Sequence, residues 1–414
     1  MRWKEEMMKK KLVMLGMILA VSMNFAVGCN RATHLPETSK DVINTTTDRL
    51  KTEDTAINDT LHIEETDNES EIDEYVQRFL DSIGSNGYIL DKSNTEKLTY
   101  DAIYAMGTKE LDYARNEIYA RHGYVFHSPQ YNTYFTSKEW YNPVEDNSSI
   151  TLNKLEQYNI ALIEFTKELR ERDYGGEFER VSEQNIYEAN KEVHLDINGD
   201  GKDEVITYDT LGEDGEDIYK AMIHVNGDAV EVSGCLDTEF AIVDIDPNDT
   251  YKEILVSDFG LSDDYRTSYY IFKDNKITQI GETEGIFDFG IRINGDGTFI
   301  ARTRTDFLHT WHYAKRHYLD QSHNIADIHD ELYEDNTPVF LQESCAFYAE
   351  KDVSSDTFTL SEGQVVTLVA SDLNEWVQIK TKGGKTGWLK LTDYNKLEDG
   401  KSIHQIFLGL FFYD

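Results

Sequence analysis

The side chains whose types and spacing best suit chemistry are oxygen-bearing residues at alternate positions of one short loop. They follow one another around a turn glycine: Asp196, Asn198, Asp200, Gly201, Lys202 and Glu204. Lys202 would contribute its main-chain carbonyl, and Glu204 its carboxylate. Oxygen ligands spaced in this way wrap a hard cation such as Ca²⁺ without leaving the segment. The pattern predicts a calcium site, and the alternative is an Asx-rich strand connection that holds no metal.

A second loop, 48 residues later, has a less regular version of this pattern. Its candidate ligands are Asp244, Asp246, Asn248 and Glu253. Asp249 replaces the turn glycine, and the last acid arrives one residue late. A third loop, a further 48 residues on, has Asn294 and Asp296 but begins with Arg292, whose charge should repel a cation. We therefore expect calcium in the first two loops only.

The constant spacing of these loops indicates a structural repeat. Each loop is followed by short runs of β-branched and aromatic residues that predict strands, about four to a unit. Position twelve of the first loop is Thr207, where an EF-hand has a glutamate, so the loop is similar instead to the calcium loops of FG-GAP or VCBS-type β-propellers. Three units are too few for an ordinary closed ring. Either further blades are hidden in the chain, or the fold is open or unusual.

An amphipathic helix should precede the repeats. Thr108 is the expected N-cap, and Glu110 places a negative charge in the first turn, where it suits the helix dipole. Leu111 and Ile118 fall on one face. Gly123 would supply the left-handed residue just after the helix end.

Four ionisable side chains crowd the second half of this helix: Arg115, Glu117, Arg121 and His122. Glu117 can pair with Arg121 four residues on. The four could bind a ligand, or they could lock the helices together through internal ion pairs and hydrogen bonds. We favour the second role, because so small a domain needs fixing polar contacts.

Residues 115–123, RNEIYARHG, resemble the signature of the YARHG domain, a small bacterial extracellular module. The resemblance extends over about residues 86–172 and takes in Tyr134, Phe135, Trp140 and Tyr141 downstream. It implies a cell-envelope context, often in lipoproteins or beside peptidases. It implies no catalytic residue.

The N-terminus resembles a bacterial lipoprotein export signal. Lys9, Lys10 and Lys11 precede an apolar run over residues 12–27, and the run ends in Ala-Val-Gly before Cys29. We expect cleavage at this point and lipid attachment to Cys29, which would hold the chain on the outer face of the membrane. The alternative is a plain signal peptide or a short anchor.

The formal net charge of −38 argues against nucleic acid and anionic lipid as partners. It is compatible with divalent cations, with cationic wall groups, or simply with solubility. Cys235 and Cys345 are more than a hundred residues apart, and we expect buried free thiols rather than a disulfide.

The C-terminal stretch resembles bacterial Src-homology-3-like domains through LSEGQVV at residues 360–366, WVQI at 376–379 and GWL at 387–389. The resemblance implies a small barrel that binds peptidoglycan peptides. Trp376 would line its groove, or it would belong to the core. The apolar tail at residues 403–413 should dock on a domain.

The sequence shows no catalytic constellation. Cys235 has no accompanying nucleophile signature, and no H-E-x-x-H spacing is present. His312 and His317 should lie on opposite faces of a strand, so they do not suggest zinc. A glycosidase needs only two carboxylates placed by the fold, and this chemistry stays open.

These patterns predict a multidomain α+β protein: a small helical YARHG domain, an all-β propeller-like repeat region and a small all-β barrel. The expected segments are a signal peptide (1–28), a disordered acidic stalk (29–69), the helical domain (70–175), the repeats (186–333) and the barrel (337–414). We expect a lipid-anchored, non-catalytic surface protein that binds peptidoglycan or another envelope component. The alternatives are a peptidoglycan hydrolase or other envelope enzyme, and a calcium-responsive sensor or inhibitor.

Overall fold

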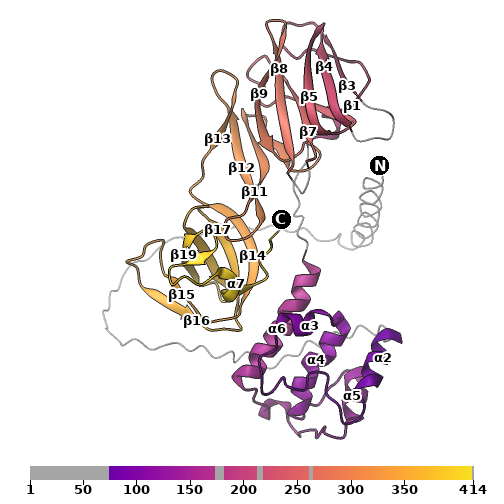
Figure 1. The fold of residues 1–414 in the computed structure, drawn as a ribbon, viewed down its shortest axis with the longest axis vertical. Coiled ribbons are helices and arrows are strands. Elements are labelled where there is room, and N and C mark those ends of the chain that lie inside the picture. Colours follow the sequence, from indigo (N-terminus) through magenta and orange to yellow (C-terminus); the bar gives the residue numbers. More distant parts are fainter. Residues whose placement is uncertain (1–73, 173–180, 212–217, 261–263, 413–414) are drawn as a thin grey trace, which may run out of the picture. The chain divides into compact units, whose positions relative to one another are not determined.

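The computed structural model describes residues 74–172, 181–211, 218–260 and 264–412 (Figure 1). Apart from the short helix α7 (Ile403–Ile406), the α-helices come first along the chain and the strands follow, which confirms the expected order of a helical region before a β-rich one. The predicted signal peptide, Cys29 and the stalk lie outside the described residues. Within the described ranges, no helix is long and apolar enough to span a membrane.

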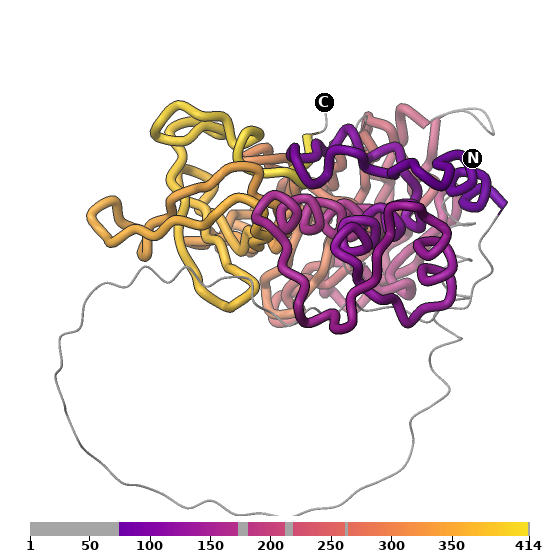
Figure 2. The backbone as a smooth tube through the Cα atoms, turned by 90° about the horizontal axis from the view of Figure 1, so that it is seen from below, coloured from indigo at the N-terminus to yellow at the C-terminus, as the bar shows by residue number. Residues whose placement is uncertain are grey.

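The helical region is drawn indigo to magenta in Figures 1 and 2. Its elements are α2 (Glu74–Ile83), α3 (Tyr100–Tyr104), α4 (Thr108–Arg121), α5 (Pro129–Thr136), η1 (Asn147–Ser149) and α6 (Lys154–Glu171). Apolar side chains of α3, α4 and α6, among them Ile103, Leu111 and Ile163, form one buried cluster. The periodicity of the sequence therefore places Leu111 and Ile118 of α4 correctly on a buried face.

The N-cap of α4 differs from the prediction. Gly107, not Thr108, is the cap, and Thr108 is the first helical residue. The reason is the side chain of Glu110, whose Oε2 accepts a hydrogen bond from the Gly107 N–H at 2.7 Å. The predicted end of the helix is confirmed, since Gly123 has a φ of +83°. A Cβ atom there would lie 2.3 Å from the carbonyl oxygen of Asn142, so only glycine fits.

Each 48-residue unit forms an antiparallel meander of four strands. The first meander consists of β2 (Val193–Leu195), β3 (Glu204–Thr210), β4 (Ile218–Val225) and β5 (Asp228–Leu236). The second consists of β6 (Glu239–Val243), β7 (Glu253–Asp258), β8 (Arg266–Lys273) and β9 (Lys276–Glu284). The third consists of β10 (Ile291–Ile293), β11 (Thr298–Thr305), β12 (Trp311–Leu319) and β13 (Ile325–Ile328). The short turn η2 (Glu183–Asn185) leads into β1 (Ile186–Glu188), which pairs with β6. In every unit the acidic or Asx-rich loop connects the first strand to the second.

The second meander is buried on both faces because it lies between the other two. Alternate residues such as Phe240 and Ile254 belong to the cluster shared with the first meander. The residues between them, such as Ala241 and Leu255, belong to the cluster shared with the third, which includes Phe299. A strand buried on both sides reads as a continuous apolar run, as β7 does.

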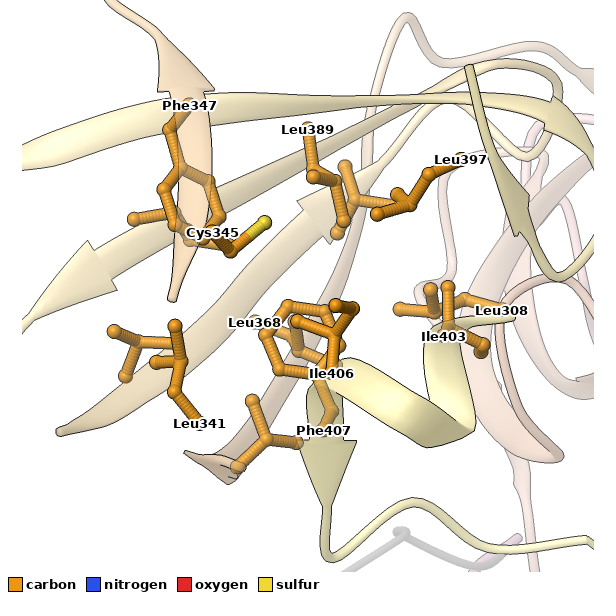
Figure 3. Close-up of a cluster of buried hydrophobic side chains, with 14 of the residues drawn as sticks. Leu308, Leu341, Cys345, Phe347, Leu368, Leu389, Leu397, Ile403, Ile406 and Phe407 are labelled. Atoms are coloured by element: carbon orange, nitrogen blue, oxygen red, sulfur yellow. The ribbon is translucent and has the colours of Figure 1, made fainter. Parts of the chain in front are cut away.

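The C-terminal region is a curled sheet with the strand order β16-β15-β19-β18-β17-β14-β21. Its elements are β14 (Tyr333–Leu341), β15 (Cys345–Tyr348), β16 (Thr357–Leu360), β17 (Val365–Ser371), β18 (Trp376–Thr381), β19 (Thr386–Asp393), β20 (Lys396–Leu397), α7 (Ile403–Ile406) and β21 (Phe407–Leu408). Figure 3 shows Ile403, Ile406 and Phe407 within its apolar interior. The prediction that the apolar tail docks on a domain is thus confirmed.

Helix α6 also contacts β14. The ring of Phe340 meets those of Tyr158 and Phe165, with centroid separations of 5.2 Å and 5.7 Å. Phe340 is fully buried in the same cluster as Leu111 and Ile118. The aromatic residues therefore join the last long helix to the first strand of the curled sheet.

The histidines are dispersed among separate contacts. His317 stacks on Phe299 and faces the second meander, whereas His312 contacts Arg302. His309 pairs with Asp335, and His323 with Asp249. Burial is the main cause that lowers the pKa of His317 to about 4, and it outweighs the opposite effect of the nearby Asp327 carboxylate.

His317 should make stability fall in acid. Its folded pKa of about 4 lies below the ordinary value of 6.5, so the unfolded chain takes up the proton first. Stability from this residue is complete above pH 6.5 and is lost as the pH falls towards 4, by up to about 1.4 kcal/mol per pH unit. The free energy of unfolding, measured by urea denaturation at several pH values from 4 to 7.5, should change less steeply with pH in His317→Gln than in the wild type. The exposed His194→Gln is the control and should keep the wild-type slope.

Candidate functional site

The carboxylate of Glu117 is the centre of a polar lattice in the helical region. Its side chain is fully buried, and its two oxygens accept hydrogen bonds from the backbone N–H groups of Ile89 and Leu90. Arg121 Nη2 donates to the same carboxylate at 3.1 Å. Burial raises the pKa of Glu117, although these donors act in the opposite direction.

Arg121 extends the lattice to the segment between α2 and α3. Its guanidinium donates to the carbonyls of Leu90 and Asp91 at 2.8 Å and 3.1 Å, and it lies over the ring of Tyr88. The contacts therefore tie the end of α4 to a stretch of chain that has little regular structure of its own.

The other two predicted residues of α4 also have internal partners. Arg115 Nη1 donates to Glu164 Oε1 on α6 at 2.7 Å. His122 Nε2 lies 2.8 Å from Glu156 Oε1, and Glu156 also forms the capping box of α6 with Asn153. All four signature side chains thus contact other parts of the helical region, an arrangement suited to holding helices in place.

A cleft of about 610 Å³ opens elsewhere in the helical region, between α2, α4 and the α5 segment. The residues that matter for its chemistry are Leu80, Asp81, Tyr113, Gln130, Tyr134 and Lys138. This volume falls within the range of small-molecule pockets. The cleft is therefore large enough for a ligand of a few residues or sugars.

Three polar groups in the cleft wall have unusual surroundings. Lys138 is only 6% exposed; its ammonium donates to the Gly84 carbonyl at 2.7 Å and lies over the Tyr134 ring. The hydroxyls of Tyr113 and Tyr134 are buried and have no hydrogen-bond partner among the described residues. Burial raises the pKa of Tyr113 to about 12, raises that of Tyr134, and lowers that of Lys138. These groups are placed to donate hydrogen bonds.

Sequence reasoning missed this cleft. Tyr134 reads as one of several aromatic residues of a core, and Tyr113 and Lys138 carry no motif. The one available signal is a lone lysine within an aromatic stretch, between Phe135 and Trp140. Its burial, which removes it from an ordinary surface role, emerges only from the contact between the segments that follow α2 and α5, where its ammonium bonds to the Gly84 carbonyl.

The first acidic loop is closed by its own hydrogen bonds. Asp196 accepts from the N–H groups of Gly199 and Gly201, and Asn198 accepts from that of Asp200. The exposed Lys202 donates its N–H to Asp200. These are the bonds of an Asx-rich turn.

The second loop differs because two of its carboxylate oxygens accept no hydrogen bond from the residues that the structure describes. Asp244 Oδ1 and Glu253 Oε1 are buried and lack hydrogen-bond partners within the described ranges. Burial, together with the carboxylates of Asp249 and Asp244, raises the pKa of Glu253 to about 8. Asp246 and Asn248 lie at the rim, where Asn248 bonds to Asp246.

The two loops use their final acid in the same way. Glu204 Oε2 accepts from the Ile197 N–H, and Glu253 Oε2 accepts from the Ile245 N–H, the second residue of each loop. The loops also touch one another, because the N–H of Lys252 donates to the Ile197 carbonyl. These two acids therefore shape the loops, whatever else they bind.

The remaining candidates lie apart. Trp376 is 8% exposed and packs edge-on against Tyr348. Cys235 and Cys345 form no disulfide with each other, as predicted, but only Cys345 is buried, whereas Cys235 is partly exposed. Burial raises the pKa of Cys345 to about 12. In the part of the chain that the structure describes, no three His, Cys, Asp or Glu side chains converge in a way that would hold a metal ion.

The family model of the YARHG domain matches residues 86–168, about a fifth of the chain. The match includes the polar lattice and most of the cleft, and it confirms the resemblance for these residues. It does not reach the meanders, the curled sheet or the N-terminus. The chain matches no curated protein.

Removing the Glu117 carboxylate should destabilise the helical region strongly. Glu117→Ala leaves two backbone N–H groups and one arginine without their buried acceptor, a loss of about 3–5 kcal/mol in the free energy of unfolding. Urea denaturation of the wild type and of the variant measures this loss of free energy. The matched control is Glu96→Ala, which removes an exposed pair with Lys92 and should change stability by less than about 0.5 kcal/mol. Equal effects of the two substitutions would show that the lattice does not hold the fold.

Proposed function

We propose that this chain is a lipid-anchored cell-surface protein that binds cell-wall peptidoglycan or another envelope component through several non-catalytic modules. The observation that carries the proposal is the sequence order of basic residues, an apolar run and Ala-Val-Gly-Cys29, ahead of a segment that matches the YARHG domain. Acylation of Cys29 would hold the following modules at the outer face of the membrane.

The modular organisation supports binding by more than one part of the chain. The first and second meanders share one apolar cluster, and the curled sheet forms another together with Phe307 and Leu308 of the third meander. We propose that the meanders are propeller-like blades and that the curled sheet is a Src-homology-3-like barrel. Both folds commonly serve as binding modules, which makes a non-catalytic role the simplest one for the assembly.

A calcium-responsive role is a second candidate, and the second loop favours it. The unpartnered oxygens of Asp244 and Glu253 are the kind of hard acceptors that Ca²⁺ prefers. The first loop has its acceptors more fully engaged, so we propose that Ca²⁺ binds more readily at Asp244, Asp246, Asn248 and Glu253 than at Asp196, Asn198, Asp200, Lys202 and Glu204. Bound Ca²⁺ would neutralise negative charge and hold the loop oxygens together.

Substitution of Cys29 should release the protein from the membrane. Full-length wild type expressed in a bacterial host should sediment with membranes and incorporate a labelled fatty acid. Cys29→Ala should do neither, whereas Cys235→Ala should behave as wild type. Membrane retention and lipid labelling of Cys29→Ala would contradict the anchor.

The purified chain from residue 30 onwards should sediment with isolated cell wall. If the second loop binds Ca²⁺, a chelator should weaken the retention at least threefold, and Glu253→Gln should resemble the chelated wild type. Retention that is indifferent to chelator would contradict the calcium role alone. A zymogram run beside the assay should show no clearing, since a clearing zone would contradict the non-catalytic proposal.

A further inference from the structure

The cleft of the helical region combines donors that the protein itself leaves unused. Tyr113 is 2% exposed, and its hydroxyl has no acceptor among the described residues. The hydroxyl of Tyr134 is also buried and has no hydrogen-bond partner among the described residues. A buried hydroxyl without an acceptor costs the fold free energy, and a ligand that supplies the acceptor recovers that cost.

Lys138 adds a positive charge to these donors. No carboxylate of the described residues lies within ion-pair distance of its ammonium, which bonds to the Gly84 carbonyl instead. The carboxylates of Glu117 and Asp81 act on this ammonium from a longer distance, but burial outweighs them and lowers the pKa of Lys138. Lys138, Tyr113 and Tyr134 line one cleft, where the Lys138 ammonium lies 4.2 Å from the centroid of the Tyr134 ring and the rings of Tyr113 and Tyr134 are in edge contact.

We propose that this cleft binds a carboxylate, specifically the C-terminal carboxylate of a short peptide, through Lys138, Tyr113 and Tyr134. One ammonium balances one negative charge. Asp81 lines the same cleft, and the chain as a whole carries −38, so a multiply charged phosphate is disfavoured. Leu80 and Pro129 give the walls an apolar part that suits small side chains next to the carboxylate.

Two sources could supply this chemistry: a peptide of the cell wall, which contains D-amino acids, and the C-terminus of a protein. The inference goes beyond the proposed function and does not depend on it. Retention on the wall can fail while the peptide binds, and the peptide can fail to bind while another module retains the chain.

Calorimetric titration of the full-length chain in detergent tests the proposal. The probes are N-acetyl-D-alanyl-D-alanine, its L,L counterpart, and the C-terminal amide of each. At least one of the free acids should bind, and its amide should bind at least about tenfold more weakly, because a charge-assisted contact is lost. Preference for the D,D or the L,L acid identifies the source of the natural ligand, and either preference supports the carboxylate site.

Variants separate binding from folding. Lys138→Met should weaken binding of the free acid at least about tenfold, and Tyr113→Phe and Tyr134→Phe about twofold to tenfold each. Neither phenylalanine variant should lower the melting temperature, since the hydroxyl it removes has no partner in the protein. Tyr141→Phe is the matched control: its hydroxyl donates to the Tyr124 carbonyl at 2.8 Å, so the melting temperature should fall while affinity stays unchanged.

Three results would overturn the proposal. The first is equal affinity for acid and amide, and the second is wild-type affinity in Lys138→Met. The third is the absence of binding of either acid at millimolar concentration to wild-type protein that is shown to be folded by its cooperative melting.

Discussion

The burial of one carboxylate, that of Glu117, is the constraint on which the helical region depends. The chain between α2 and α3 has little regular structure, so its backbone groups need partners from elsewhere. Glu117 accepts from two of its N–H groups, and Arg121 donates to two of its carbonyls. Asn159 of α6 bonds to three more of its backbone groups. These donors offset part of the cost of burying the charge, although burial still raises the pKa of Glu117 and Arg121 Nε has no hydrogen-bond partner among the described residues.

The same physical device recurs in the meanders. An acid at the start of the second strand, Glu204 or Glu253, bonds to the backbone N–H of its loop's second residue. The third loop lacks an acid there and is closed instead by Asp296, which accepts from the N–H and the hydroxyl of Thr298. The second meander is held on both faces by apolar side chains, so the repeat is stabilised mainly by stacking, and the acids fix the loops that connect the strands.

The sequence specifies most of the fold because its strongest signals are local. Helical periodicity and Gly123 locate α4, and the regular spacing locates the three meanders. The helix α5 is not evident, because Tyr131, Asn132 and Thr133 have poor helix propensity and tertiary packing overrides it; only Pro129 in the first turn marks it. The lattice residues can be named from sequence, and so can the pair of Glu117 with Arg121, but the partners that lie far along the chain cannot. Glu117 lies 28 residues from Ile89, and no pattern in the chain links the two.

Helix α4 contributes one group of residues to the polar lattice and another residue, Tyr113, to the wall of the cleft. Glu117 and Arg121 have their hydrogen-bonding capacity largely engaged within the protein, so a ligand would have to break buried contacts to reach them. Tyr113 lies one turn before Glu117 on the same helix, and its hydroxyl is unengaged. Because the lattice fixes the position of α4, it also fixes the wall of the cleft before any ligand arrives, and binding then requires little reorganisation. The residues that give the segment its recognisable signature would thus serve recognition indirectly, by holding in place donors that carry no signature at all.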